Sequence, residues 1–433
     1  MTLSRTPLPL LLVVLATASP AHGGGMAKGE LARVSVGPIG EEANGTSFFP
    51  SLSDDGRFVA FDSLATNLVA DDTNVFRDVF VHDRKKGVNK LVSLSVSGAK
   101  ADMACHSPAM SANGRYVTFL STADLMEDGA LFLLRAYVRD VKKKKTTLVS
   151  LRSDGSAIST HVSQPSISGN GRFVAFVTKA NDVVPGDTAG TDDVFLHDRK
   201  TGQTVAVTRR PDGTPGGGDP SQASISKSGR FVAFDSTATD LVDGDGNGVR
   251  DVFVFDRKKK KVERVCVPYD SGEANGVSGN APVSISADGR FVAFDSNASN
   301  LIPGDTNGKV DVFVFDRKKN LTTRVSESTD GVASNSLSSQ PAISPDGRFV
   351  TFQSYATNLV SGDDEGEADV FLHDRKTRTT VRLSQSAAGV GADDTSGRTA
   401  LSKKANYIAF ESIASNLIPG VTNVKTDIFL RRR

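Results

Sequence analysis

The chain has 433 residues, and its 51 basic side chains almost balance its 50 acidic ones. A net charge near zero gives no long-range attraction to a polyanion, so no nucleic-acid partner is expected. Apolar residues make up 38% of the chain, which is enough to build large buried cores.

The first 21 residues have the pattern of a secretory signal peptide. Arg5 precedes an apolar run from Leu8 to Ala16, and small residues follow. The run is too short to cross a bilayer, and no other stretch approaches the roughly 20 apolar residues that a membrane helix needs. We therefore predict a signal peptide over residues 1–21 and a secreted or periplasmic protein that does not span the membrane.

One passage then recurs seven times with an aromatic residue at a constant phase. Successive copies are 57 to 60 residues apart, which is too regular for chance and too long for one rung of a solenoid, so each copy is expected to form a small sheet. We number the copies one to seven by these aromatic residues, which are Phe58, Tyr116, Phe173, Phe231, Phe291, Phe349 and Tyr407.

The fifth copy shows four strand signals, over residues 283–286, 290–294, 311–315 and 323–326. Asp288-Gly289 between the first two is typical of a tight hairpin turn. The second and third strands are apolar at successive positions, so both faces of the sheet must be covered. Neighbouring sheets in a ring would cover them.

The two ends of the repeat region complement each other. Residues 31–36 read as a fourth strand without partners, and residues 427–430 read as a third strand with no fourth strand after it. We therefore predict an all-β protein with a single domain over residues 31–433. It would be a seven-bladed β-propeller of four-stranded antiparallel blades, closed by the N-terminal strand joining the C-terminal blade. A solenoid is the alternative, but it would need polar capping repeats, which the sequence does not show.

The repeat phrase Ser-Ala-Asp-Gly-Arg-Phe-Val-Ala-Phe at residues 286–294, followed by Asp-Val-Phe-Val-Phe-Asp-Arg at residues 311–317, resembles the repeat of TolB-like (WD-like) β-propeller proteins. The resemblance covers nearly the whole region after the predicted signal peptide and implies a propeller fold. Propellers of this kind serve as adaptors, as periplasmic partners and as accessory domains of enzymes, so the resemblance leaves the function open.

The loop between the second and third strands carries a spaced set of oxygen-bearing side chains, Asp-x-Asn-x-x-x-Asp. Calcium prefers carboxylate and amide oxygens from short, turn-rich loops, although a calcium loop usually adds a bidentate acid that is absent here. The same residues also suit Asx-turns, which hold a loop without metal, and both interpretations remain open. The candidate calcium ligands are Asp72, Asn74 and Asp78 in blade one, Asp245, Asn247 and Asp251 in blade four, Asp305, Asn307 and Asp311 in blade five, and Asp363, Glu365 and Asp369 in blade six. Blade three keeps Asp187 and Asp193 but has Ala189 between them.

An Asn or Asp earlier in the same loop is present in all seven copies, and we predict that it anchors the loop. These residues are Asn67, Asp124, Asp182, Asp240, Asn300, Asn358 and Asn416.

Histidine and cysteine give little sign of catalysis. His82, His197 and His373 share one repeat phase at which other copies have Phe255 and Phe315, so they are expected to be exposed residues at a strand end rather than catalytic groups. Cys105 and Cys266, the two cysteines, fall in non-adjacent blades and are expected to be free and buried.

Basic residues gather in the turns between the first and second strands and between the third and fourth strands, which lie at the same end of a blade. They would either keep tight turns soluble or attract anionic envelope polymers and lipid head groups.

Two functional hypotheses follow. The first is an exported, non-enzymatic propeller, expected to be a monomer, that binds an envelope or extracellular protein or a polysaccharide through its long-loop face, with Ca2+ in some loops. The second is an exported propeller hydrolase or lyase acting on carbohydrate or phosphate esters, which would need copy-specific acids, bases or metal ligands converging at the channel mouth. The candidates for such convergence are Glu41, Glu42, Asp102, His106, His161, Asp219 and Asp394.

Overall fold

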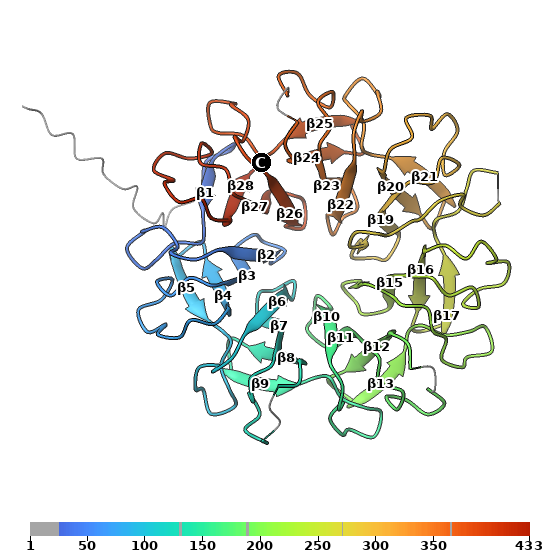
Figure 1. Cartoon of the computed structure of the whole chain (residues 1–433), viewed down its shortest axis with the longest axis horizontal. Coiled ribbons are helices and arrows are strands. Elements are labelled where there is room, and N and C mark those ends of the chain that lie inside the picture. Colours follow the sequence, from blue (N-terminus) through green and yellow to red (C-terminus); the bar gives the residue numbers. More distant parts are fainter. Residues whose placement is uncertain (1–25, 130–131, 188–189, 271, 364–365) are drawn as a thin grey trace, which may run out of the picture.

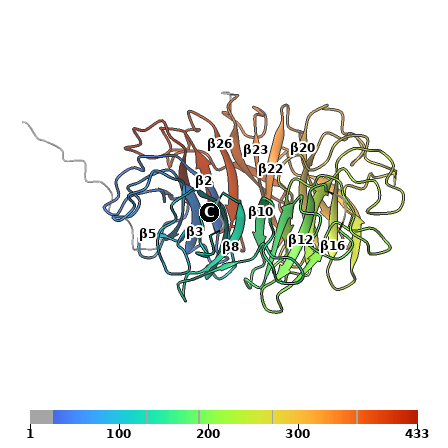
Figure 2. The same cartoon turned by 60° about the horizontal axis from the view of Figure 1, so that its bottom comes forward.

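A computed structural model describes residues 26–129, 132–187, 190–270, 272–363 and 366–433, so the predicted signal peptide lies outside the described residues. These residues form seven four-stranded antiparallel sheets arranged in a ring, with no helix among them (Figure 1). In the turned view the ring is a thick disk (Figure 2). The predicted all-β, seven-bladed propeller is confirmed.

Each blade has the same order of strands from the axis to the rim. The first strands, nearest the axis in Figure 1, are β2 (Ser47–Leu52), β6 (Cys105–Met110), β10 (Val162–Ile167), β14 (Ala223–Ile225), β18 (Ser284–Ile285), β22 (Ser338–Ile343) and β26 (Ser396–Leu401). The second strands are β3 (Phe58–Ser63), β7 (Tyr116–Ser121), β11 (Phe173–Thr178), β15 (Phe231–Ser236), β19 (Phe291–Ser296), β23 (Phe349–Ser354) and β27 (Tyr407–Ser412). The third strands are β4 (Asp78–Asp83), β8 (Arg135–Asp140), β12 (Asp193–Asp198), β16 (Asp251–Asp256), β20 (Asp311–Asp316), β24 (Asp369–Asp374) and β28 (Asp427–Arg432). The fourth strands are β5 (Val88–Leu91), β9 (Lys145–Leu148), β13 (Gln203–Ala206), β17 (Lys261–Arg264), β21 (Leu321–Arg324), β25 (Thr379–Arg382) and, for blade seven, β1 (Leu31–Arg33).

Strand β1 closes the ring. It pairs antiparallel with β28, with Leu31 opposite Arg431 and Arg33 opposite Phe429. Blade seven is therefore built from both ends of the described chain, as the two partial repeats predicted.

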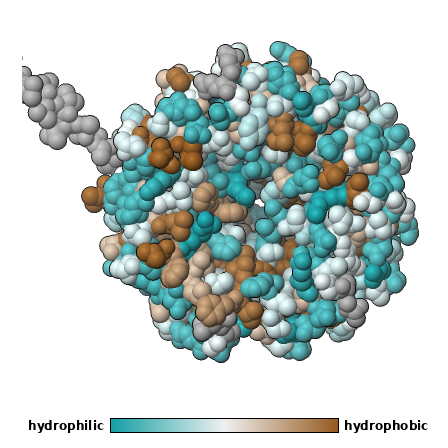
Figure 3. Space-filling view, viewed as in Figure 1, coloured by the Kyte–Doolittle hydropathy of each residue, from teal (hydrophilic) through white to brown (hydrophobic). Residues whose placement is uncertain are grey.

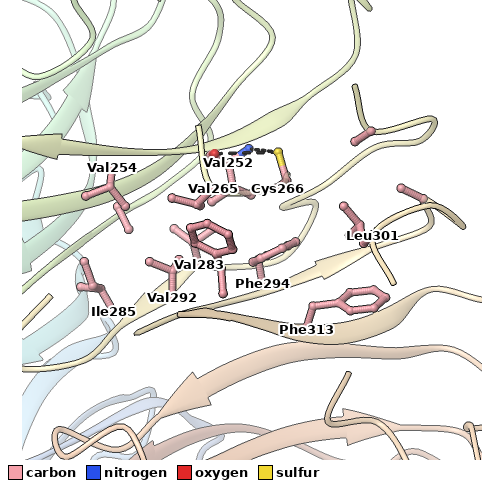
Figure 4. Close-up of a cluster of buried hydrophobic side chains, with 14 residues drawn as sticks. Val252, Val254, Val265, Cys266, Val283, Ile285, Val292, Phe294, Leu301 and Phe313 are labelled. Carbon is pink, nitrogen blue, oxygen red and sulfur yellow. Dashed lines mark hydrogen bonds between the residues drawn. The ribbon is translucent and has the colours of Figure 1, made fainter. Parts of the chain in front are cut away.

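The hydrophobic core lies between blades. One cluster joins Val252 and Val254 of blade four to Val292, Phe294 and Phe313 of blade five (Figure 4). Inside each blade an aromatic pair links the second and third strands, as with the Phe294 and Phe313 rings, whose centroids are 6.1 Å apart. Residues at successive positions of these strands are buried because each sheet has a neighbour on both faces.

We call the end of the ring that carries the two kinds of tight turn the short-turn face, and the opposite end the long-loop face. On the short-turn face the turn glycine of one blade lies against the repeat aromatic of the preceding blade. At Gly289, where φ is +74°, a Cβ atom would lie 2.1 Å from Phe231 Cδ2. Glycine is required here both by the backbone conformation and by the close approach.

The repeat aromatics also carry stacked guanidinium groups from the next blade. In six of the seven blades described, an arginine after the third strand lies 3.9–4.9 Å from the ring centroid of the preceding blade's aromatic, a cation–π arrangement. The pairs are Arg84 with Tyr407, Arg199 with Tyr116, Arg257 with Phe173, Arg317 with Phe231, Arg375 with Phe291 and Arg433 with Phe349.

The arginines of the first turns are also paired, each with the aspartate that ends its own third strand. Burial opposes ionisation of Asp374, but the hydrogen bonds from Arg348, the Lys376 N–H and Thr377 together with the charge of Arg348 outweigh it and lower the pKa of Asp374 to about 2. Six blades share this pair, with N–O distances of 2.6–2.8 Å: Arg57–Asp83, Arg115–Asp140, Arg172–Asp198, Arg230–Asp256, Arg290–Asp316 and Arg348–Asp374. The short-turn face is thus less free to attract anions than its arginine content suggests.

The expectation of exposed histidines is wrong. His82, His197 and His373 are all buried, and burial lowers the pKa of each to about 4. His373 Nδ1 is 3.0 Å from Thr380 Oγ1 on the fourth strand, and Thr380 in turn donates to the carbonyl of Glu327 in the preceding blade. The sequence could not show that a connection from the neighbouring blade covers this strand end.

The cysteine prediction is confirmed, since Cys105 and Cys266 are both free and buried. Within the described residues, no helix has the length and apolar character needed to cross a membrane.

Candidate binding site at the channel mouth

The first strands lie nearest the axis of the ring, and most of them carry a β-bulge. In five blades the pairing of the first and second strands is interrupted by a bulge, and the bulged residue has a positive φ. Bulges of this kind re-aim a side chain and are common beside functional sites. The bulged residues are Phe49, Ser107, Gln164, Gln340 and Arg398.

Two buried acids of the second strands bind the bulges of the next blade. The Phe49 N–H donates to Glu411 Oε1 at 2.5 Å, and the Ser107 N–H donates to Asp62 Oδ2 at 2.8 Å. Glu411 belongs to blade seven and Asp62 to blade one, so each acid joins its blade to the following one. Both contacts lie near the start of the first strands, which is the long-loop end of the channel.

Two arginines surround these acids. Arg77 Nε is 3.7 Å from Asp62 Oδ1, and the Arg77 guanidinium lies 5.1 Å from the ring centroid of Phe48. The Arg398 guanidinium lies 4.2 Å from the ring centroid of Phe49. We call Phe48, Phe49, Asp62, Arg77, Arg398 and Glu411 the mouth cluster.

Burial is the main influence on the two acids. It raises the pKa of both Asp62 and Glu411 to about 7, although a backbone hydrogen bond and the two arginines act in the opposite direction. The charge of Asp62 adds to the rise at Glu411. Both groups can therefore exchange a proton near neutral pH, a property that is frequent at functional sites.

A cavity of about 140 Å³ opens beside the mouth cluster. Its walls include Phe48 of blade one, Gln340 and Gln353 of blade six, and Arg398 and Glu411 of blade seven. Figure 3 shows the central opening of the ring on one face, with hydrophilic and hydrophobic residues at its border. The cavity has room for a small polar group of a larger ligand, and amide, guanidinium and carboxyl groups are available to bind it.

The copy-specific acids and histidines singled out in the sequence do not line this cavity. Glu42 is bound by Arg33 and Thr422 near blade seven, and His161, which precedes the first strand of blade three, accepts the Leu134 N–H of blade two. Asp394 comes nearest, because its carboxylate accepts the N–H of Thr395, a residue of the cavity wall, at 2.6 Å. The residues that do converge were missed. The sequence could have pointed to them through the fifth residue of the second strand, which varies from blade to blade. This position is occupied by Asp62, Leu120, Val177, Asp235, Asp295, Gln353 and Glu411.

The predicted calcium loops are held mainly by their own amides. In blade five Asn307 Nδ2 donates to Asp311 Oδ2 at 2.7 Å and to the Ser334 carbonyl at 3.1 Å, and Asn74 and Asn247 make the same two contacts in blades one and four. The Oδ1 atom of each of these asparagines also accepts the backbone N–H two residues further on, at 2.8–3.1 Å, which is the contact of an Asx-turn. The predicted anchor role is confirmed as well: Asn300, for example, accepts the Asn275 N–H and donates to the Glu273 carbonyl.

An arginine of the fourth strand reaches the two aspartates of each loop in blades four, five and six. Arg324 Nη1 is 3.2 Å from Asp305 Oδ1 and 3.5 Å from Asp311 Oδ2, and Arg264 and Arg382 are placed in the same way. A metal ion would compete with these guanidinium groups for Asp245, Asp251, Asp305, Asp311, Asp363 and Asp369. Glu365 lies outside the described residues. Among the residues that are described, no cluster of three or more His, Cys, Asp or Glu side chains is placed to hold a metal.

The comparisons with known proteins bear on the fold. No known protein family matches the sequence, and no curated protein does. Many solved structures are similar. One is the β-propeller domain of the Trilobed protease from Pyrococcus furiosus, at TM-score 0.52 and 10% identity, over 85% of this chain and 91% of that one. Another is the Pyrococcus horikoshii acylaminoacyl peptidase, also at TM-score 0.52 and 10% identity, over 90% of this chain.

TolB from Acinetobacter baumannii is also among the similar structures, at TM-score 0.41 and 14% identity, over 78% of this chain. The chain spans 63% of that TolB chain and 52% of the peptidase chain. The protein is thus a seven-bladed β-propeller.

Proposed function

We propose that the protein is an exported, non-enzymatic β-propeller that binds an envelope or extracellular protein, or a polysaccharide, through its long-loop face. The observation that carries this proposal is the cavity at the channel mouth. Its walls come from blades six, seven and one, and they include three side chains, Gln353, Arg398 and Glu411, that no other blade has at the equivalent position.

The arrangement of the acids supports binding over catalysis. Each carboxyl of the mouth cluster accepts a backbone N–H of the neighbouring blade, so each has a structural task that explains its presence. The other copy-specific acids and histidines are spread over several blades. A general acid or base would instead be expected to face a substrate site together with its partners.

The proposal can be tested by measuring affinity for a panel of envelope polysaccharides and extracellular proteins. Arg398→Gln should weaken binding at least tenfold, because it removes the guanidinium group from the cavity wall. Glutamine is a suitable replacement, since blade six has glutamine, Gln340, at the equivalent bulge. Lys318→Ala, in an exposed turn on the short-turn face, is the matched control and should leave the affinity unchanged. Binding that depends on Lys318 and not on Arg398 would contradict the proposal.

A hydrolase or lyase is the second candidate, and the pKa of about 7 at Asp62 and Glu411 is the observation that favours it. Turnover of chromogenic glycosides or phosphate esters, abolished by Glu411→Gln with the fold intact, would establish it. The glutamine keeps an oxygen that accepts the Phe49 N–H, so the fold should survive the change.

Calcium in the loops of blades one, four, five and six remains a prediction. The test is the melting temperature measured with calcium and then with chelator. Bound calcium should give a higher melting temperature, because a ligand that binds only the folded state stabilises that state.

A further inference from the structure

Four blades place a cation at the same point of their sheets. The fourth-strand residue opposite the middle aromatic of the third strand is arginine in these blades, and its side chain reaches the aspartate that begins the third strand. The N–O distances to this aspartate are 3.3–3.5 Å for Arg264–Asp251, Arg324–Asp311, Arg382–Asp369 and Arg33–Asp427.

Two further blades supply a cation from elsewhere in the sequence. In blade one Leu91 replaces the arginine, and the charge of Lys100 favours ionisation of both Asp72 and Asp78. In blade two the third strand itself begins with Arg135, which lies 3.1 Å from Asp128. Six blades therefore balance the acids of this loop with a positive side chain of the protein.

Blade three differs, because within the described residues neither of its two loop aspartates forms an ion pair, and the charge of Arg210 favours ionisation of Asp193 alone. Alanine, as Ala206, stands opposite Phe195, so no long side chain extends from the fourth strand. Asp187 and Asp193 are nevertheless retained, and they are only 4% and 1% exposed. Within the described residues, Asp193 Oδ1 accepts from Thr208, but Asp193 Oδ2 has no hydrogen-bond partner, and the Asp187 carboxylate has no side-chain donor and only a backbone contact with Val183.

Buried carboxylate oxygens without a side-chain donor or an ion pair are costly in the absence of a cation. In blade five a single guanidinium nitrogen lies within 3.5 Å of both equivalent aspartates, so one positive group between the two carboxylates satisfies this geometry.

We propose that blade three binds one calcium ion between Asp187 and Asp193, in the place that a guanidinium group takes in blades four to six. Calcium prefers carboxylate oxygens and tolerates irregular coordination completed by water, which suits a site with few protein ligands. Blade three lacks the loop asparagine of the predicted calcium pattern. In blade three, however, no fourth-strand arginine lies between the two carboxylates, so a metal would not have to displace one. This site is independent of ligand binding at the channel mouth.

The test is a comparison of melting temperatures of the full-length protein in 1 mM CaCl2, in 1 mM MgCl2 and in EGTA, with the stoichiometry measured by calorimetric titration of CaCl2. We expect one calcium per chain and a rise of about 2–4 °C over EGTA. Magnesium should give a smaller rise, because it demands a more regular ligand set.

Two variants sharpen the test. Ala206→Arg installs the arginine of blades four to six and should abolish the calcium response while raising the melting temperature in EGTA. Asp187→Asn should do the same, because it removes the repulsion without changing the shape. Asp305→Asn, the equivalent change in blade five, is the control that should keep the response.

A melting temperature equal in calcium and EGTA would overturn the proposal, as would a calcium response that survives in Asp187→Asn. If lowering the pH to 5 in EGTA reproduces the whole stabilisation and calcium adds nothing to it, the two aspartates share a proton and no metal is bound.

Discussion

The short-turn face and the long-loop face are built from the same seven repeats but differ in how closely the copies agree. On the short-turn face nearly every blade repeats the same contacts, with a turn glycine and an arginine against the preceding blade's aromatic ring and an arginine–aspartate pair beside them. On the long-loop face the copies diverge, and the one mouth cavity draws residues from blades six, seven and one. The first face holds the ring together, and the second is free to carry a binding site.

The largest effect should come from filling the space beside a repeat aromatic. Gly289 and Gly304 both have φ of +74°, but an added Cβ would meet the Phe231 ring at Gly289 and nothing within 4 Å at Gly304. We expect Gly289→Ala to cost about 2–4 kcal/mol, from backbone strain and overpacking, and Gly304→Ala about 1 kcal/mol from strain alone. Equal losses in urea unfolding would show that the short-turn face is not the tighter of the two.

The next effect depends on pH. The pKa of His373 falls from 6.5 in the unfolded chain to about 4 in the fold, so its stabilising contribution is present above pH 6.5 and is lost as the pH falls from 6.5 to 4. His373→Phe copies blade five, where Phe315 faces Thr322. Between pH 7 and pH 4 the wild type should lose up to about 3 kcal/mol more than the variant. Parallel stability curves from urea unfolding would contradict this.

A smaller effect is expected for the stacked arginines. Arg375 lies 4.3 Å from the Phe291 centroid and donates to the Gly347 carbonyl at 2.5 Å, so Arg375→Lys should cost about 1 kcal/mol. Blade two has Val141 at this position, and Val141→Arg should stabilise the protein by less than about 1 kcal/mol by covering Phe58. A loss of stability in the second variant would mean that blade two has no room for the stack.

The smallest effect on stability is expected at the mouth cluster. Arg398 is exposed, and its guanidinium contacts the Phe49 ring, so Arg398→Gln should change the free energy of unfolding by no more than about 0.5 kcal/mol. The same variant is expected to lose ligand binding. A large loss of stability would show that this part of the long-loop face supports the ring rather than the ligand.

Much of the fold could be predicted because its signals are local and repeated. The aromatic phase, a turn of Asp, Asn or Ser followed by Gly, and the two consecutive apolar strands occur in each full copy, and the partial repeats at the ends predicted the pairing of β1 with β28. The free cysteines and the loop anchors followed from the same register.

The site could not be predicted in the same way, because it depends on which variable positions of distant blades meet. Glu411 and Phe49 are 362 residues apart in sequence and share a hydrogen bond only because the ring closes. The sequence does show that Arg264, Arg324 and Arg382 recur at one position of the repeat. It does not show that they contact the loop aspartates, because that depends on how the fourth strand is aligned with the third.

By itself the sequence determined that seven alike sheets would form and that the ends would complete one of them, because strand and turn preferences act between neighbours in the chain. Only the tertiary structure decided which groups are buried, paired or left without a partner. Burial of His373, the raised pKa of Glu411 and the uncompensated pair in blade three all depend on side chains brought from other blades or strands, and these distances exist only in the closed ring.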